Sequence, residues 1–148
     1  LNFGDIIIKN NGRSDANTNQ QLTFKIKRWN FMNILLVDDD KNLLNNLKKL
    51  LQDIYSYNID ISTTCLGAII QHTENNYDVL IIDFDFGDDM NGIEVATLIR
   101  NTDKEIKIII FSAYDIGILG SQTIQSIGAT FLQKPIDHEI LNKNIKGI

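Results

Sequence analysis

The stretch Ile34-Leu35-Leu36-Val37-Asp38-Asp39-Asp40 places four aliphatic residues directly before three carboxylates. A continuous aliphatic run is typical of a strand that is buried on both faces of a parallel sheet. Three neighbouring carboxylates raise one another's pKa and cost stability unless water or a cation balances them. The stretch therefore predicts a buried strand that ends at a solvated or cation-binding edge of a sheet.

From Asn33 onward, strand-like blocks alternate with helix-like blocks. The predicted strands are 33–37, 58–63, 79–83, 106–111 and 129–132. The apolar residues of 43–54 recur with the spacing of an amphipathic helix, and further helices are predicted at 66–75, 92–101, 114–127 and 137–146. This alternation predicts an α/β domain, a doubly wound five-stranded parallel sheet with helices on both faces.

The composition excludes several classes of protein. The chain has 148 residues, of which 43% are hydrophobic and 22% charged, as expected for one globular domain. Residues 32–148 hold 9 basic and 17 acidic residues, a net charge of -8 that disfavours binding to nucleic acid. Cys65 is the single cysteine, and no apolar run approaches the length of a membrane span. We therefore expect a cytoplasmic protein without a disulfide, a membrane partner or a nucleic-acid partner.

Residues 1–31 differ from the rest of the chain. They are rich in Asn, Gln, Lys and Gly, and their two apolar runs, 6–8 and 22–26, have no partner that would make a core. We expect this segment to be a disordered or loosely attached extension, or sequence upstream of a true start at Met32. The folded domain is then predicted to span residues 32–148.

Polar side chains follow the predicted strands. The carboxyl ends of parallel strands meet at one edge of a sheet, so residues there converge even when they are far apart in sequence. The residues at these ends are Asp38, Asp39, Asp40, Asp83, Asp85, Ser112, Ala113, Lys134 and Pro135. The sequence therefore predicts a crevice that collects carboxylates, a hydroxyl and an ammonium.

These groups support a narrow range of chemistry. Carboxylate oxygens from two strands suit Mg²⁺. Asp83 lies at the carboxyl end of the third of the five predicted strands and can act as a nucleophile towards phosphorus, forming an aspartyl phosphate. Lys134 would place positive charge on the phosphoryl oxygens, and Ser112 could donate a hydrogen bond to one of them.

With these residues in place, residues 33–148 resemble the CheY-like receiver domain of bacterial two-component response regulators. The resemblance rests on an ordered set of motifs: Asp38-Asp39, Asp83, Gly92 at the start of the next helix, Ser112-Ala113, Gly128-Ala129 and Lys134-Pro135. It implies the strand order 2-1-3-4-5 and a cis peptide bond between Lys134 and Pro135. It also implies a regulatory phosphoacceptor, not an enzyme, which either makes up a whole single-domain regulator or belongs to a longer protein.

The resemblance further implies a site and its partners. Mg²⁺ would be held by Asp38, Asp39, Asp83 and the main-chain carbonyl of Asp85. Asp83 would be phosphorylated by a sensor histidine kinase or a histidine phosphotransfer protein. Ser112 and the aromatic Phe131 would form the switch, and a downstream protein would bind the fourth helix, the fifth strand and the fifth helix.

The loop after Asp83 departs from the family pattern. Gly87 stands where the family commonly has a proline, and Gly92 lies nine residues beyond Asp83 instead of eight, so the loop 84–91 has one extra residue. A receiver that no longer takes phosphate and acts only as a protein-interaction module therefore stays open as an alternative.

A second alternative is a phosphatase of the haloacid dehalogenase type, because residues 81–85 read as a strand ending in Asp-x-Asp. That family carries this motif on its first strand and an Asp-Asp pair later in the chain, whereas here the Asp-Asp pair comes first.

Other residues have simpler interpretations. Asp38, Asp39 and Asp40 could cap a helix, with Asp40 given no functional role; His72 and His138 are predicted to be surface residues, and Cys65 to serve packing.

Overall fold

The structure is a computed structural model in which residues 31–87, 90–115 and 117–148 can be described. Apart from Phe31, the N-terminal extension expected at 1–31 lies outside these residues. In chain order the elements are β1 (Asn33–Val37), α1 (Lys41–Tyr55), β2 (Asn58–Ser62), α2 (Cys65–Glu74), β3 (Val79–Asp83), α3 (Gly92–Thr102), β4 (Lys107–Ser112), α4 (Gly117–Ser126), β5 (Thr130–Gln133) and α5 (His138–Lys146). The predicted elements are all present, and most boundaries differ by one or two residues.

The five strands form one parallel sheet in the order β2-β1-β3-β4-β5. Both the doubly wound α/β class and the implied strand order are confirmed. β3 pairs with β1 on one side and with β4 on the other, so its aliphatic run is enclosed by strands as well as by helices. The last residue of β3, Asp83, is therefore placed at the centre of the sheet edge.

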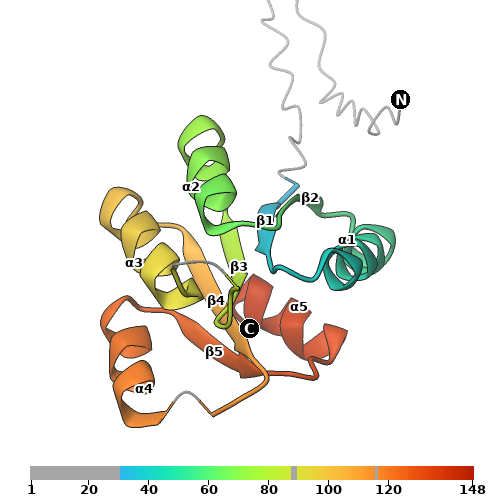
Figure 1. Cartoon of the computed structure of the whole chain (residues 1–148). Helices are drawn as coiled ribbons and strands as arrows, with labels where there is room; N and C mark the ends of the chain where they lie inside the picture. Colours follow the sequence, from blue (N-terminus) through green and yellow to red (C-terminus); the bar gives the residue numbers. More distant parts are fainter. Residues whose placement is uncertain (1–30, 88–89, 116) are drawn as a thin grey trace, which may run out of the picture. The chain divides into compact units, whose positions relative to one another are not determined.

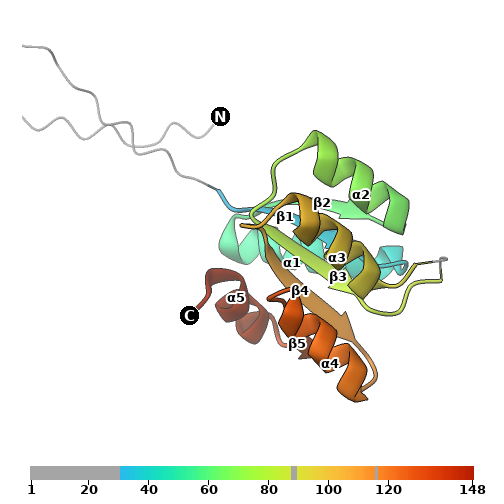
Figure 2. The same cartoon turned by 90° about the vertical axis from the view of Figure 1, so that its left-hand side faces the viewer.

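Helices cover both faces of the sheet (Figure 1). Helices α1 and α5 lie on one face, and α2, α3 and α4 lie on the other; the view in Figure 2 is turned by 90°. The core divides in the same way: Ile34 and Leu36 pack with residues of α1 and α5, whereas Leu35 and Val37 pack with residues of α2 and α3. This alternation explains why β1 is aliphatic throughout, since successive side chains point to opposite faces and both faces are buried.

Two helices near the site begin with well-formed caps. Asp40 caps α1, and its Oδ1 accepts hydrogen bonds from the N–H groups of Asn42 and Leu43 at 2.9 and 3.0 Å. Asn91 caps α3 in a reciprocal capping box with Glu94. Such caps satisfy N–H groups that the first turn of a helix leaves unpaired, and they fix where each helix leaves the sheet edge.

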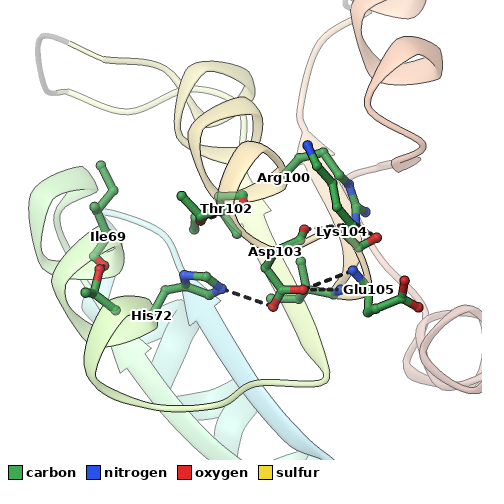
Figure 3. Close-up of polar contacts among 10 residues, drawn as sticks. Ile69, His72, Arg100, Thr102, Asp103, Lys104 and Glu105 are labelled. Carbon is green, nitrogen blue, oxygen red and sulfur yellow. Dashed lines mark hydrogen bonds and ion pairs between the residues drawn. The ribbon is translucent and has the colours of Figure 1, made fainter.

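A polar cluster at the C-terminal ends of α2 and α3 joins these helices to β4 (Figure 3). His72 Nε2 lies 3.3 Å from Asp103 Oδ2, while Asp103 Oδ1 accepts the N–H groups of Glu105 and Ile106. Arg100 Nε donates to the carbonyl of Ile127 at 2.9 Å. The prediction that His72 is a surface residue is wrong, because only 12% of its side chain is exposed.

The second histidine is also less exposed than predicted. His138 is half-buried, and its Nδ1 lies 3.1 Å from the hydroxyl of Tyr55, so that it links α5 to the end of α1. Cys65 is buried in the core, as expected for a packing role. Within the described ranges, no helix is both long enough and apolar enough to cross a bilayer.

Candidate functional site at the carboxyl edge of the sheet

Asp83 is a carboxylate at the end of the most enclosed strand. It is the last residue of β3, it pairs in register with Phe111 of β4, and it is only 5% exposed. The helix that follows packs tightly against it: Gly92 N–H donates to the carbonyl of Phe84 at 3.0 Å, and a Cβ on Gly92 would lie 1.9 Å from the carbonyl oxygen of Asp83. The backbone therefore allows little freedom at this position.

Lys134 joins two of the predicted site carboxylates. Its Nζ lies 2.8 Å from Asp38 Oδ2 and 2.8 Å from Asp83 Oδ1, so these two oxygens are within twice that distance of each other. The lysine directly follows β5, where its N–H donates to the carbonyl of Ser112 at 2.8 Å. The peptide bond to Pro135 is cis, which confirms what the resemblance implied.

Burial and charge set the ionisation of this pair. Burial raises the pKa of Asp83. The hydrogen bond and the positive charge of Lys134 lower this pKa in part, whereas the negative charges of Asp38 and Asp85 raise it further. Burial by itself would lower the pKa of Lys134, but its hydrogen bonds to Asp38 and Asp83 outweigh burial and raise that pKa. Lys134 therefore stays an ammonium, held between two carboxylates in a partly water-excluded site.

The three consecutive aspartates have different surroundings. Asp38 is buried, and its second oxygen, Oδ1, accepts the N–H of Asp40 at 2.8 Å. Asp40, for which no functional role was predicted, is the cap of α1. Asp39 is exposed, and its Oδ2 lies beside Gly87, 3.4 Å from where a Cβ on that glycine would be.

Ser112 and Asp85 form a second contact at the same edge. Ser112 is fully buried; its Oγ accepts the N–H of Tyr114 at 3.0 Å and donates to Asp85 Oδ2 at 3.4 Å. Asp85 was predicted to contribute a carboxylate to the crevice and its main-chain carbonyl to the metal, but this side-chain contact with Ser112 was not predicted. The signal was the adjacency of β3 and β4, because residues just beyond neighbouring parallel strands face one another.

Phe131, the predicted aromatic switch residue, lies on β5. Its side chain is half-buried and packs against the core cluster on the face covered by α2, α3 and α4. The structure thus places it on the face opposite α5, and its role stays a prediction.

The donor set suits a hard divalent cation. Among the described residues, no three His, Cys, Asp or Glu side chains are grouped as a metal site, and one oxygen of the predicted ligand Asp39 lies beside Gly87. Mg²⁺, however, commonly takes only one or two carboxylates and completes its shell with water. Asp38 and Asp83, which approach a common ammonium, meet that requirement, while the larger ligand set with Asp39 and the carbonyl of Asp85 stays a prediction.

Comparison with known proteins identifies the family. The model of the response regulator receiver domain matches residues 34–146, which is most of the chain. This chain belongs to that family. The receiver domain is a regulatory domain of two-component systems, so both the resemblance and the regulatory class are confirmed.

Individual relatives are distant. The chain is 27% identical over 89 residues to the transcriptional regulatory protein ComA of Bacillus subtilis, covering 56% of this chain and 40% of that protein. It is 26% identical over 116 residues to the sensory transduction protein LytT of Bacillus anthracis, covering 78% and 46%. The receiver thus spans less than half the length of these relatives.

Solved structures give the same fold. A CheY-like receiver domain protein from Methanospirillum hungatei has a TM-score of 0.73 at 24% identity, covering 79% of this chain and 92% of that one. The response regulator TrrA from Thermotoga maritima, in complex with Mg²⁺ and beryllium fluoride, has a TM-score of 0.70 at 29% identity, covering 79% and 98%.

Proposed function

We propose that this receiver domain accepts a phosphoryl group on Asp83, in a reaction that requires Mg²⁺, and passes the signal on through a conformational switch. The observation that carries the proposal is the contact of one ammonium, that of Lys134, with both Asp38 and Asp83 at 2.8 Å. This contact brings together a candidate nucleophile (Asp83), a candidate metal ligand (Asp38) and a positive charge (Lys134) at one point of the sheet edge.

The residues present suit the attack of a carboxylate on phosphorus. An oxygen of Asp83 would form the bond to phosphorus while the bond from phosphorus to a histidine nitrogen of the donor breaks. Bound Mg²⁺ would supply positive charge to the phosphoryl oxygens. Lys134 would do the same from the protein side, and its raised pKa keeps that charge in place.

The switch would use Ser112, at the end of β4, and Phe131, on the adjacent strand β5. Phosphorylation adds nearly two negative charges and three acceptor oxygens. The Ser112 hydroxyl could turn towards one of those oxygens, and Phe131 on the neighbouring strand would then repack. A downstream protein would read the change on α4, β5 and α5, and a sensor histidine kinase or histidine phosphotransfer protein would supply the phosphoryl group.

The experiment is incubation with acetyl phosphate and Mg²⁺, followed by intact mass measurement. We expect one phosphate adduct on the wild type and on Asp53→Asn, a matched change of an exposed aspartate on α1, and none on Asp83→Asn. Chelation of Mg²⁺ should abolish the adduct. An adduct on Asp83→Asn would place the phosphoryl group elsewhere and contradict the proposal.

A non-phosphorylated protein-interaction module is the second candidate. The observation that favours it is the position of Asp39, whose carboxylate is exposed and lies beside Gly87 in the lengthened loop. The same measurement separates the two functions, because a module of this kind takes no phosphate from acetyl phosphate even when Mg²⁺ is present.

A further inference from the structure

Helix α1 carries a row of exposed apolar side chains. Leu43, Leu50 and Ile54 are between 37% and 49% exposed, and their spacing of i, i+7 and i+11 places them on one side of the helix. The side that faces the core is marked by the buried Leu44 and Leu51. Single exposed apolar residues are ordinary on a protein surface, but a row along one helix is typical of a contact surface. We call Leu43, Leu50 and Ile54 the α1 stripe.

A groove between α3 and α4 offers a surface that such a stripe could enter. The groove has a volume of about 560 Å³, and its lining includes the half-buried Met90, the buried Ile93 and Leu98, which is 46% exposed. Gly120 of α4 also lines the groove and adds no side chain to it. An apolar gap between two neighbouring helices is the kind of site into which an amphipathic helix lays its apolar face. We call this feature the α3–α4 groove.

The charges of the two surfaces are opposite. Among the described residues that line the α3–α4 groove, the charged one is Glu94, which is exposed. Helix α1 holds three lysines and one aspartate, a net charge of +2. The rest of residues 32–148 holds 6 basic and 16 acidic residues, a net charge of -10. Opposite charges favour the approach of two surfaces, so α1 suits a groove with an acidic residue in an otherwise acidic domain.

The two surfaces lie on different sides of the domain. Helix α1 covers one face of the sheet, and α3 and α4 cover the other (Figure 1 and Figure 2). The α1 stripe therefore cannot enter the groove of its own chain, whereas the stripe of a second copy can. A contact of this kind uses a different surface on each partner, so it leaves a free stripe at one end of the assembly and a free groove at the other.

We propose that this chain self-associates head to tail, with α1 of one copy bound in the α3–α4 groove of the next. With 15 residues, α1 is long enough to lie along α3, which has 11. One helix in one groove buries an area at or below the roughly 1,200 Å² of a small stable interface. The association is therefore weak and depends on protein concentration, and it requires neither Mg²⁺ nor phosphorylation.

Sedimentation equilibrium of the full chain, from about 10 µM to about 1 mM, tests the proposal. We expect the average mass of the wild type to rise with concentration. Leu50→Ser alters the stripe and Leu98→Ser alters the groove, and each should weaken association roughly three- to tenfold, because a partly exposed leucine no longer gains by burial. Leu66→Ser changes a leucine on α2 that is 67% exposed and belongs to neither surface, so it should associate like the wild type.

A mixture of the two variants distinguishes head-to-tail binding from a symmetric contact. Leu50→Ser keeps an intact groove, and Leu98→Ser keeps an intact stripe. An equimolar mixture should therefore associate more strongly than either variant alone. It should stop at pairs, because the surfaces that each pair leaves free are the altered ones. Formation of the pairs also shows that both variants are folded.

Three results would overturn the proposal. A wild type that stays monomeric at about 1 mM does not use these surfaces on itself, and they are then left to a different protein. If Leu66→Ser weakens association as much as the other two variants, the contact lies elsewhere. If the mixture associates no more strongly than its components, the stripe does not bind the groove. None of these results changes the expected adduct on Asp83, so the function proposed above is tested separately.

Discussion

Substitution of Gly92 by alanine should destabilise the domain strongly, because the new atom would collide with the main chain of Asp83. The added Cβ would lie 1.9 Å from the carbonyl oxygen of Asp83 and 2.9 Å from its carbonyl carbon. Carbon–oxygen contacts in proteins are about 3.3 Å or longer, so helix α3 or the end of β3 must move by about 1.5 Å. The end of β3 cannot move freely, because β3 is paired on both sides.

The magnitude follows from the cost of overpacking. Extra atoms in a packed site cost about 1–3 kcal/mol, and a clash with the main chain of a central strand belongs at the upper end. With a urea dependence of about 1.5 kcal/mol per molar for a small domain, a loss of about 3 kcal/mol lowers the unfolding midpoint by about 2 M. Without the clash the sign would be opposite, since alanine favours helix over glycine by up to about 1 kcal/mol.

Urea unfolding of two glycine variants tests this reasoning. Among the residues that the structure describes, a Cβ on Gly87 would meet Asp39 Oδ2 at 3.4 Å, which is an ordinary contact. Gly87→Ala should therefore unfold within about 0.5 kcal/mol of the wild type. If Gly92→Ala unfolds at the same urea concentration as Gly87→Ala, the close approach of α3 to Asp83 does not exist and the account of the site backbone is refuted.

Three further variants have expected effects on stability, all measurable by urea unfolding. Lys134→Ala leaves two buried carboxylates without their cation and should cost about 1–3 kcal/mol at pH 7. The loss should shrink as the pH is lowered, because the raised pKa of Asp83 makes it take up a proton earlier than an ordinary carboxyl, and a loss that does not change with pH would contradict this. Asp103→Asn should cost about 0.5–1 kcal/mol at pH 7. Partial burial alone would raise the pKa of Asp103, but hydrogen bonds from two N–H groups and His72 lower it, so its contribution is present above its ordinary pKa and disappears as the pH falls through the lowered value. Asp40→Ala removes the cap of α1 and should cost about 1 kcal/mol; no loss would contradict the capping role.

The fold could be predicted because its signals are local and repeated. The aliphatic runs of β1, β3 and β4 need no partner to be recognised as buried strands, and the amphipathic spacing of α1 marks one helix face. The start of α4 is harder to predict: the sequence pattern predicts a start at residue 114, whereas the helix begins at Gly117, which has a positive φ of 65°. Glycine there accepts a backbone conformation that the periodic pattern does not reveal.

The sequence predicts which residues meet at the site, because these residues follow the ends of parallel strands, but it does not predict how their side chains are oriented. The convergence of residues after β1, β3, β4 and β5 follows from parallel topology alone, and it brings Lys134 to Asp38 and Asp83. The direction of each side chain depends on local hydrogen bonds that the sequence does not specify. His72, for example, lies beside Asp103, which is 31 residues away in sequence and belongs to the end of another helix.

The negative charge at the sheet edge explains why the proposed phosphorylation would use a divalent cation. Asp38, Asp39, Asp83 and Asp85 lie at the ends of β1 and β3, and Lys134 is in contact with two of them. A phosphoryl group would add nearly two more negative charges to this edge. One ammonium cannot offset both the carboxylates and the phosphoryl group, so phosphorylation without a divalent cation would be strongly opposed by repulsion.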